Sequence, residues 1–287
     1  MLVPLCSGFG YAVAALMLKR GSEGAGPWRV TFVTNWVIAA LFSLTWLFPT
    51  KNPATLAHVA HAAMSGGLFF IGQIFTFLAL SRGDVSVATP VLGSKVVFVA
   101  LFTVLFGLEQ LGNSIWLAVL LTAAATALLG GGSHAQRDAI VRSLIYGFSA
   151  ALAFAMTDIT QQRWLPQWGL VPYMTTLFTT MALLSLALLP LFMKDGRQIS
   201  GASWRWLVGG AALLGGQASG VAWGIMTLGA TTTNVLYNSR GVWSVVLVWS
   251  IGHWFGNTER AHGRGVMLRR LAASLLLLSA ILLITRH

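Results

Sequence analysis

The sequence predicts an all-α polytopic membrane protein with ten transmembrane helices, arranged as two inverted five-helix repeats. The first observation is composition, because 56% of the 287 residues are hydrophobic and only 9% are charged, whereas a soluble domain carries about 25% charged residues. The second is spacing, because Asp, Glu, Lys and Arg do not occur in residues 30–50, 52–81, 110–136, 164–193 or 206–239. Each gap is long enough for the roughly 20 apolar residues that cross a bilayer. A soluble protein is therefore excluded.

Ten apolar segments, separated by charged residues or by Pro, Gly and Asn, are the expected spans. A helix satisfies its own backbone hydrogen bonds in lipid, whereas the strands of a membrane barrel alternate over about ten residues and give a weaker signal. The segments fall at 2–18, 28–48, 58–80, 85–107, 114–131, 143–162, 171–193, 204–228, 232–255 and 267–285.

The formal net charge of +11, from 18 Lys and Arg against 7 Asp and Glu, is interpreted as a topology signal. No basic face or RNA-binding motif accompanies it, so no nucleic-acid partner is expected. Thirteen of the basic residues fall in loops after odd-numbered spans, and three fall on the opposite side with the C-terminus. Because Lys and Arg are enriched in cytoplasmic loops, both termini are expected outside the cytoplasm.

An internal repeat divides the chain. Residues 77–86 (FLALSRGDVS) precede a long apolar segment that ends in LFGLE at 105–109. Residues 225–233 (IMTLGATTT) likewise precede one that ends in WFGNTE at 254–259. In each half, one further apolar segment follows the Glu.

This repeat predicts five helices in residues 1–132 and five in residues 143–287, joined by a connecting loop at 133–142. An odd number of helices per repeat forces the two copies into opposite orientations. Secondary transporters have this plan, with the substrate site near the bilayer midplane between the halves.

Three stretches carry a resemblance to a known family. Residues 79–90 (ALSRGDVSVATP), then 104–109 (VLFGLE), then the apolar segment 112–129 resemble the signature of the EamA-type carriers of the drug/metabolite transporter superfamily. A degraded second copy runs over 227–283. The resemblance implies a ten-helix carrier that exports or exchanges small metabolites, without a bound cofactor and without ATP hydrolysis.

Two features depart from that family. The second half has Tyr-Asn-Ser-Arg at 237–240, where the family has a proline in the corresponding helix. Members of the family also usually have cytoplasmic termini, whereas the charge count predicts the reverse.

Two cations lie deep within expected spans. Lys95 is about ten residues into the fourth span and Arg240 about eight residues into the ninth, and a charge at such depth is costly unless it faces a cavity or a partner. The two spans correspond in the two repeats. Arg presents a bidentate fork and Lys a point charge to a carboxylate or phosphate. We therefore expect Lys95 and Arg240 to bind an anionic group of the substrate.

The sequence leaves alternatives open for these charges. Either cation is otherwise explained by pairing with a structural carboxylate or by snorkelling to the membrane surface, which is easier for Arg240 than for the deeper Lys95. Proton coupling is a further alternative for Lys95. Asp158, in the sixth span, is the only deep acid and is a candidate for proton coupling. Arg163, five residues further on, is an alternative partner for Asp158.

Neutral polar residues are expected to complete the site. Tyr237, Arg240 and Ser244 lie three and four residues apart on one helix face. The other expected members are Asn238 beside them, Asn35, Gln73, Gln217 and Trp223. Hydrogen bonding between helices explains each neutral residue equally well.

The remaining ionisable residues predict no further site. Glu109 and Glu259 occupy matching positions at helix ends and are expected to cap or anchor the following helix. His58 and His61 lie three residues apart without a third ligand, so no metal site is expected. Cys6 is the single cysteine, so no intrachain disulfide forms.

The predicted function is secondary transport, as an exporter or exchanger of small organic metabolites that are anionic or zwitterionic, such as amino acids. Alternating access around a central cavity is the expected mechanism. The alternative is a flippase for a lipid or lipid carrier on the same scaffold. An integral membrane enzyme is less favoured, because the seven acids are scattered singly. We expect no catalytic residues and no cofactor, a location in the bacterial cytoplasmic (inner) membrane, and a monomer or homodimer in the lipid bilayer.

Overall fold

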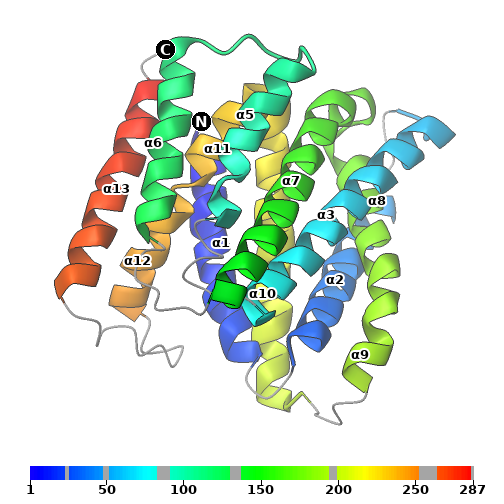
Figure 1. The fold of residues 1–287 in the computed structure, drawn as a ribbon. Coiled ribbons are helices and arrows are strands. Elements are labelled where there is room, and N and C mark those ends of the chain that lie inside the picture. The colour runs from blue at the N-terminus through cyan, green and yellow to red at the C-terminus, as the bar shows by residue number, and fades with distance from the viewer. Residues whose placement is uncertain are drawn as a thin grey trace.

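The computed structural model describes residues 1–22, 26–47, 52–82, 91–129, 137–193, 199–251 and 264–285. This part of the chain is helical and contains no β-strand. Its elements, labelled in Figure 1, are α1 (Leu2–Gly21), α2 (Pro27–Ser43), η1 (Leu44–Leu47), α3 (Leu56–Arg82), α5 (Lys95–Leu105), α6 (Asn113–Leu129), α7 (Arg137–Trp168), α8 (Leu170–Ser185), η2 (Leu186–Leu188), α9 (Leu189–Met193), α10 (Gly201–Leu228), α11 (Ala230–Tyr237), α12 (Arg240–Ile251) and α13 (Arg264–Thr285).

The all-helical membrane fold is confirmed for the described residues. Six helical stretches are long and apolar enough to cross a membrane, namely Leu2–Gly21, Trp28–Leu47, Leu56–Ala79, Ile140–Trp168, Leu170–Leu191 and Ser203–Leu228. Two shorter apolar helices cover Val91–Leu105 and Asn113–Leu128. The chain is therefore an integral, multi-pass membrane protein, while the count of ten spans and the inverted repeat stay predictions.

The expectation that residues 232–255 form one helix is wrong. Helix α11 ends at Tyr237, Asn238 and Ser239 form a turn, and α12 starts at Arg240. The Ser239 N–H donates to the Leu236 carbonyl at 3.1 Å, which is the tighter i to i+3 pattern that often closes a helix. Arg240 consequently lies in the first turn of a helix and not in the middle of one.

Helix α5 begins in a similar way. Residues 91–93 are helical, Ser94 forms a turn, and α5 starts at Lys95. The two cations predicted to bind substrate are therefore each the first residue of a helix. The positive end of the helix dipole lies at such a first turn. Backbone hydrogen bonds nevertheless cross both breaks, because the Val97 N–H donates to the Ser94 carbonyl at 2.9 Å and the Gly241 N–H to the Asn238 carbonyl at 3.0 Å.

Helix α1 packs along α10 and beside the break between α11 and α12 (Figure 1). The glycines of α10 allow this approach, because a methyl group added at Gly210 would lie 2.9 Å from the Leu18 side chain and one at Gly224 2.7 Å from Pro4. Small residues permit close helix packing in lipid, where the hydrophobic effect supplies no driving force. The glycine-rich stretch of α10 is thus a packing surface for α1.

The remaining helices flank this centre. Helix α3 packs against α7 and α8, and α6 packs against α13 (Figure 1). Buried Tyr173 and Phe178 of α8 pack with Leu165 of α7 in the largest apolar cluster. A smaller cluster, with Val99, Ile225 and Tyr237, lies next to the break between α11 and α12. This second cluster forms the apolar wall of the site described next.

Candidate substrate-binding site

Lys95 is paired with a carboxylate. Its Nζ lies 2.7 Å from Oδ2 of Asp158 on α7, and the two side chains are 19% and 7% exposed. Asp158 does not pair with Arg163, whose side chain is exposed. Of the roles that the sequence leaves open for Lys95, pairing with a carboxylate is therefore the one seen here. Removal of either partner would leave an uncompensated charge in the helix bundle.

Asn234 of α11 is a second ligand of the same carboxylate. Its Nδ2 donates to Oδ2 of Asp158 at 2.6 Å and to the Ala230 carbonyl oxygen at 2.9 Å. Asp158 thereby connects α5, α7 and α11. Asn234 was not among the predicted site residues, because it does not lie on the helical stripe of Arg240. Its position inside the polar run Thr-Thr-Thr-Asn was the available signal.

Unlike Lys95, which is paired with a carboxylate, Arg240 is next to aromatic rings. Its Cζ lies 4.9 Å from the ring centroid of Tyr11 on α1 and 4.7 Å from that of Tyr237. Its Nη1 donates to the Tyr237 hydroxyl at 3.4 Å. The two tyrosine rings meet edge to face, with centroids 6.0 Å apart. We call Arg240, Tyr11 and Tyr237 the arginine box.

No carboxylate forms an ion pair with Arg240 among the residues that the structure describes. Asp158 is close enough to interact with it electrostatically, but its ion pair is with Lys95. The centre of the protein thus holds two cations, one carboxylate and the N-terminal ends of two helices. The result is a net positive site, and such a site attracts anions.

A glycine of α1 sets the position of the arginine box. A methyl group added at Gly8 would lie 2.7 Å from the Ser239 hydroxyl oxygen and 3.0 Å from the Tyr237 carbonyl oxygen. Only a residue without a side chain lets α1 approach the break between α11 and α12 this closely. Tyr11, one turn further along α1, is thereby brought to Arg240. Tyr11 carried no site signal in the sequence, because aromatic residues are common in membrane helices.

The predicted neutral residues are only partly brought together. Tyr237 contacts Arg240, as expected. Asn35 and Gln73 bind each other instead, with reciprocal side-chain hydrogen bonds of 3.0 and 3.2 Å between α2 and α3. For this pair, the alternative of hydrogen bonding between helices is the one observed.

Four other expectations concern α10 and α12. Gln217 faces α1 close to Gly10, and its buried Oε1 has no hydrogen-bond partner within the described ranges. Trp223, Asn238 and Ser244 are half-buried. No side-chain hydrogen bond joins any of these three to Arg240 in the part of the chain that is described.

Glu109 anchors a different helix from the one expected. It lies in the linker between α5 and α6, yet its carboxylate accepts hydrogen bonds from Nε2 of Gln162 on α7 and from the backbone N–H of Ala230, the first residue of α11. Oε1 of Gln162 in turn accepts from the Ala230 N–H at 3.2 Å. Burial raises the pKa of the Glu109 carboxyl above its usual value, although these hydrogen bonds act in the opposite direction. Glu259 lies outside the described residues.

The turn into α11 depends on Gly229. This residue has φ of +82° and is the sole residue between α10 and α11. A side chain would be strained at that backbone conformation and would overlap the Glu109 carboxylate. Glu109 and Gly229 together fix where α11 begins.

The histidines of α3 stack on tryptophans of α7. His61 lies over Trp164 at 4.1 Å between ring centroids, and His58 lies 5.6 Å from Trp168. Within the described residues, no three His, Cys, Asp or Glu side chains are grouped to hold a metal. These stacks join α3 to the C-terminal end of α7.

The fold and this ionic centre define a multi-pass membrane protein with charged residues inside its helix bundle. Residues 1–131 match the EamA-like transporter family, so the resemblance predicted from the sequence motifs is confirmed. A protein of Archaeoglobus fulgidus named as an uncharacterized transporter is 32% identical over 96 residues, which cover 33% of this chain and 34% of that protein. The match thus spans about a third of the relative. The family and the relative are both named as transporters.

A crystal structure of another protein has the same fold. It superposes with a TM-score of 0.78 over 99% of this chain and 97% of the other, at 17% sequence identity. At this identity the likeness concerns the fold alone. It extends over both halves of the chain, whereas the family match ends at residue 131.

Proposed function

We propose that the protein is a secondary transporter of small organic metabolites that carry an anionic group, including zwitterions such as amino acids. Its ten spans form two inverted repeats, residues 1–132 and 143–287, joined by 133–142, and it works by alternating access between them. The family match, which covers residues 1–131, supports the first of these boundaries. The proposed location is the bacterial inner membrane, as a monomer or homodimer, with the termini outside the cytoplasm as the charge distribution favours.

The observation that carries the proposal is the arginine box. A buried or half-buried cation in a membrane helix normally has a carboxylate partner, and Lys95 has one. Arg240 has two tyrosine rings in its place. A substrate carboxylate supplies the missing counter-charge, and the flat guanidinium binds it with two hydrogen bonds. The tyrosine rings hold the guanidinium in place and contact the apolar part of the ligand.

The helix break contributes to the same site. Discontinuous helices in transporters direct their N-terminal ends at anionic groups of the substrate. The first turns of α5 and α12 both start at a cation. The proposed anion site therefore combines the Arg240 guanidinium with the N-terminal ends of α5 and α12.

Asp158 is the proposed coupling residue. When its carboxylate accepts a proton, Lys95 loses its counter-ion and becomes a second ligand for the substrate anion. Asn234 remains in place, because its amide also donates to the Ala230 carbonyl. Proton binding and anion binding are thereby coupled at adjacent groups.

Counterflow in proteoliposomes tests the proposal. Vesicles loaded with an unlabelled amino acid mixture should accumulate labelled amino acid through the wild-type protein, and Arg240→Met should abolish this. Arg163→Met is the matched control, because this arginine is exposed on α7, and it should transport normally. Unchanged counterflow in Arg240→Met would contradict the anion site.

A flippase for lipids or lipid carriers is the second candidate, and one observation favours it. Phe9 and Trp243 meet edge to face at 5.3 Å and are 42% and 37% exposed. Trp243 lies one turn from Arg240 on α12. An exposed aromatic pair there suits a ligand that enters from the bilayer. Scrambling of a fluorescent anionic lipid in the same vesicles, lost in Arg240→Met, would favour the flippase over the carrier.

A further inference from the structure

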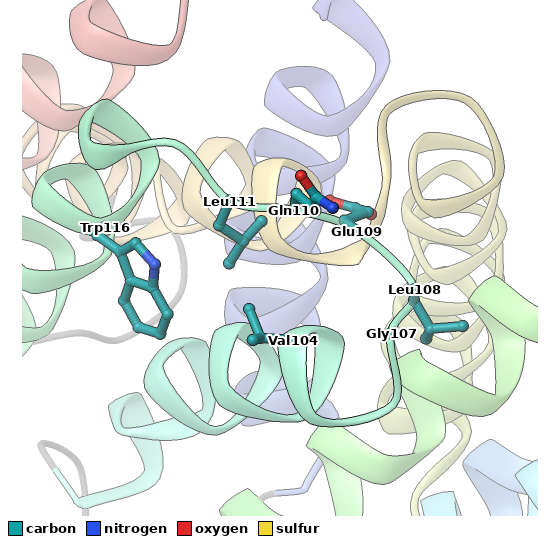
Figure 2. Close-up of a pocket in the computed structure, with 7 residues that line it drawn as sticks. All are labelled: Val104, Gly107, Leu108, Glu109, Gln110, Leu111 and Trp116. Carbon is teal, nitrogen blue, oxygen red and sulfur yellow. The ribbon is translucent and has the colours of Figure 1, made fainter.

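A hollow at the far end of α5 belongs to neither ionic centre. It has a volume of about 550 Å³ and is lined by Val104, Gly107, Leu108, Glu109, Gln110, Leu111 and Trp116 (Figure 2). This volume lies within the range of roughly 300–1,000 Å³ that is usual for small-molecule sites. Lys95 starts α5 and the hollow adjoins its other end, about 15 Å away at 1.5 Å per residue. The hollow is therefore separate from the Lys95–Asp158 pair, and its lining includes no residue of the arginine box.

Two kinds of surface meet in this hollow. Val104 of α5, Leu111 of the linker and Trp116 of α6 point toward a common space (Figure 2) and form an apolar wall. Glu109 and Gln110 supply the polar part of the lining. An apolar wall with a few polar groups is the usual composition of a ligand site.

The polar part is negative. Glu109 is half-buried and accepts from the Gln162 amide, but no Lys, Arg or His forms an ion pair with it in the described ranges. Burial raises the pKa of its carboxyl, as expected for a carboxylate that has lost water without gaining a cation. A cationic ligand would stabilise the ionised form.

The aromatic lining suits a cation as well. The face of a tryptophan ring attracts ammonium groups more strongly than other aromatic side chains do. Trp116 provides such a ring in the lining of the hollow, and Leu111 lies between it and Glu109 in Figure 2. A cationic ligand in the hollow is attracted by both residues, while an anion is repelled by the carboxylate.

We infer that this hollow binds a small organic cation, with its ammonium group at Glu109 and its apolar body against Val104, Leu111 and Trp116. The proposed ligand of the hollow is a cation, whereas the proposed ligand of the arginine box is an anion. The inference goes beyond the proposed transport function and holds even if the chain moves a different substrate. The ammonium group comes either from a soluble amine or from the head group of a zwitterionic phospholipid.

Calorimetric titration of the purified full-length protein with benzyltrimethylammonium tests the inference. The wild type should bind it saturably, and Glu109→Gln should weaken binding by about tenfold or more because a charged contact is lost. Trp116→Leu should weaken it several-fold, and Arg240→Met should leave it unchanged. Neopentylbenzene, which has the same shape without the charge, should bind much more weakly.

Three results would overturn the inference: no saturable binding to the wild type, equal affinity of Glu109→Gln, or equal binding of neopentylbenzene. Gln at position 109 keeps an oxygen that accepts from Gln162, so the anchor of α11 is preserved. If Glu109→Gln nevertheless fails to fold, Trp116→Leu decides, because Trp116 has no part in that anchor.

Nanodiscs distinguish the two sources of the ammonium group. If phosphatidylcholine added to phosphatidylglycerol discs weakens binding of the probe, the site takes a lipid head group. If binding is the same in both discs, the site takes a soluble amine. Competition by phosphatidylglycerol itself, which has no ammonium group, would contradict the inference.

Discussion

Lys95 and Arg240 begin helices in the two halves of the chain, yet their surroundings differ. Lys95 lies 2.7 Å from a carboxylate, whereas Arg240 lies between two tyrosine rings. The first arrangement neutralises a charge and ties three helices together. The second holds a charge in place without neutralising it. The two cations therefore have different surroundings. We expect Arg240, which has no ion pair within the described residues, to be the better ligand for the proposed substrate anion.

The largest expected effect comes from removing one partner of the Lys95–Asp158 ion pair. Asp158→Leu leaves Lys95 without a counter-ion and removes one of the two acceptors of the Asn234 amide, so we expect a loss of about 3 kcal/mol in unfolding free energy. Lys95→Met combined with Asp158→Leu removes both charges and should recover most of that loss. Reversible unfolding in mixed micelles measures both variants. Equal losses in the single and the double variant would mean that the ion pair does not determine stability.

A second prediction concerns how the arginine box is assembled. Gly8→Ala places a methyl group against Ser239 and the Tyr237 carbonyl, so we expect a cost of about 1–3 kcal/mol from overpacking. Transport should fall more steeply than stability, because α1 carries Tyr11 away from Arg240. Gly216→Ala is the matched control, since no atom of another described segment lies within 4 Å of a methyl group added there. A Gly8→Ala protein as stable and active as Gly216→Ala would disprove the close approach of α1.

A third prediction compares two cations at the same place. Arg240→Lys keeps the charge but loses the planar fork and its stacking on Tyr11 and Tyr237. We expect the half-saturating substrate concentration in counterflow to rise about tenfold, with little change in unfolding temperature. Arg163→Lys serves as the control on the exposed surface of α7. Unaltered half-saturation in Arg240→Lys would show that charge alone is sufficient.

These surroundings were only partly predictable. The absence of charge over long stretches placed the helices, and depth within the spans singled out Lys95, Arg240 and Asp158. The partners were not predictable, because they depend on where α11 ends. Helix α11 ends in a turn at Asn238 and Ser239, without a proline. The spacing of apolar residues in the sequence does not indicate such a turn.

For Glu109 too, the partners could not be predicted from the sequence, although its position could. Its place at a helix end was evident from the sequence, but the following helix α6 is not the one that it anchors. The contact with Gln162 and the start of α11 joins segments more than fifty residues apart. Such pairings follow from packing between helices, which a single sequence does not specify.

The smallest expected effect concerns the pH dependence of stability, which should distinguish Glu109 from Asp158. Both carboxylates contact α11. Asp158 has Lys95 as a counter-ion, whereas Glu109 has only hydrogen-bond donors among the described residues. Because burial raises the folded-state pKa of Glu109, its contribution to stability is fully present below the unfolded pKa, about 4.3. It is lost as pH rises through the raised folded pKa. The difference in unfolding temperature between Glu109→Gln and the wild type should therefore grow in favour of the variant as pH rises from 4 to 7. Glu109 is half-exposed, so solvent screening keeps this change smaller than the others. A difference that stays constant over this range would mean that a cation already compensates Glu109, and would remove the contrast with Asp158.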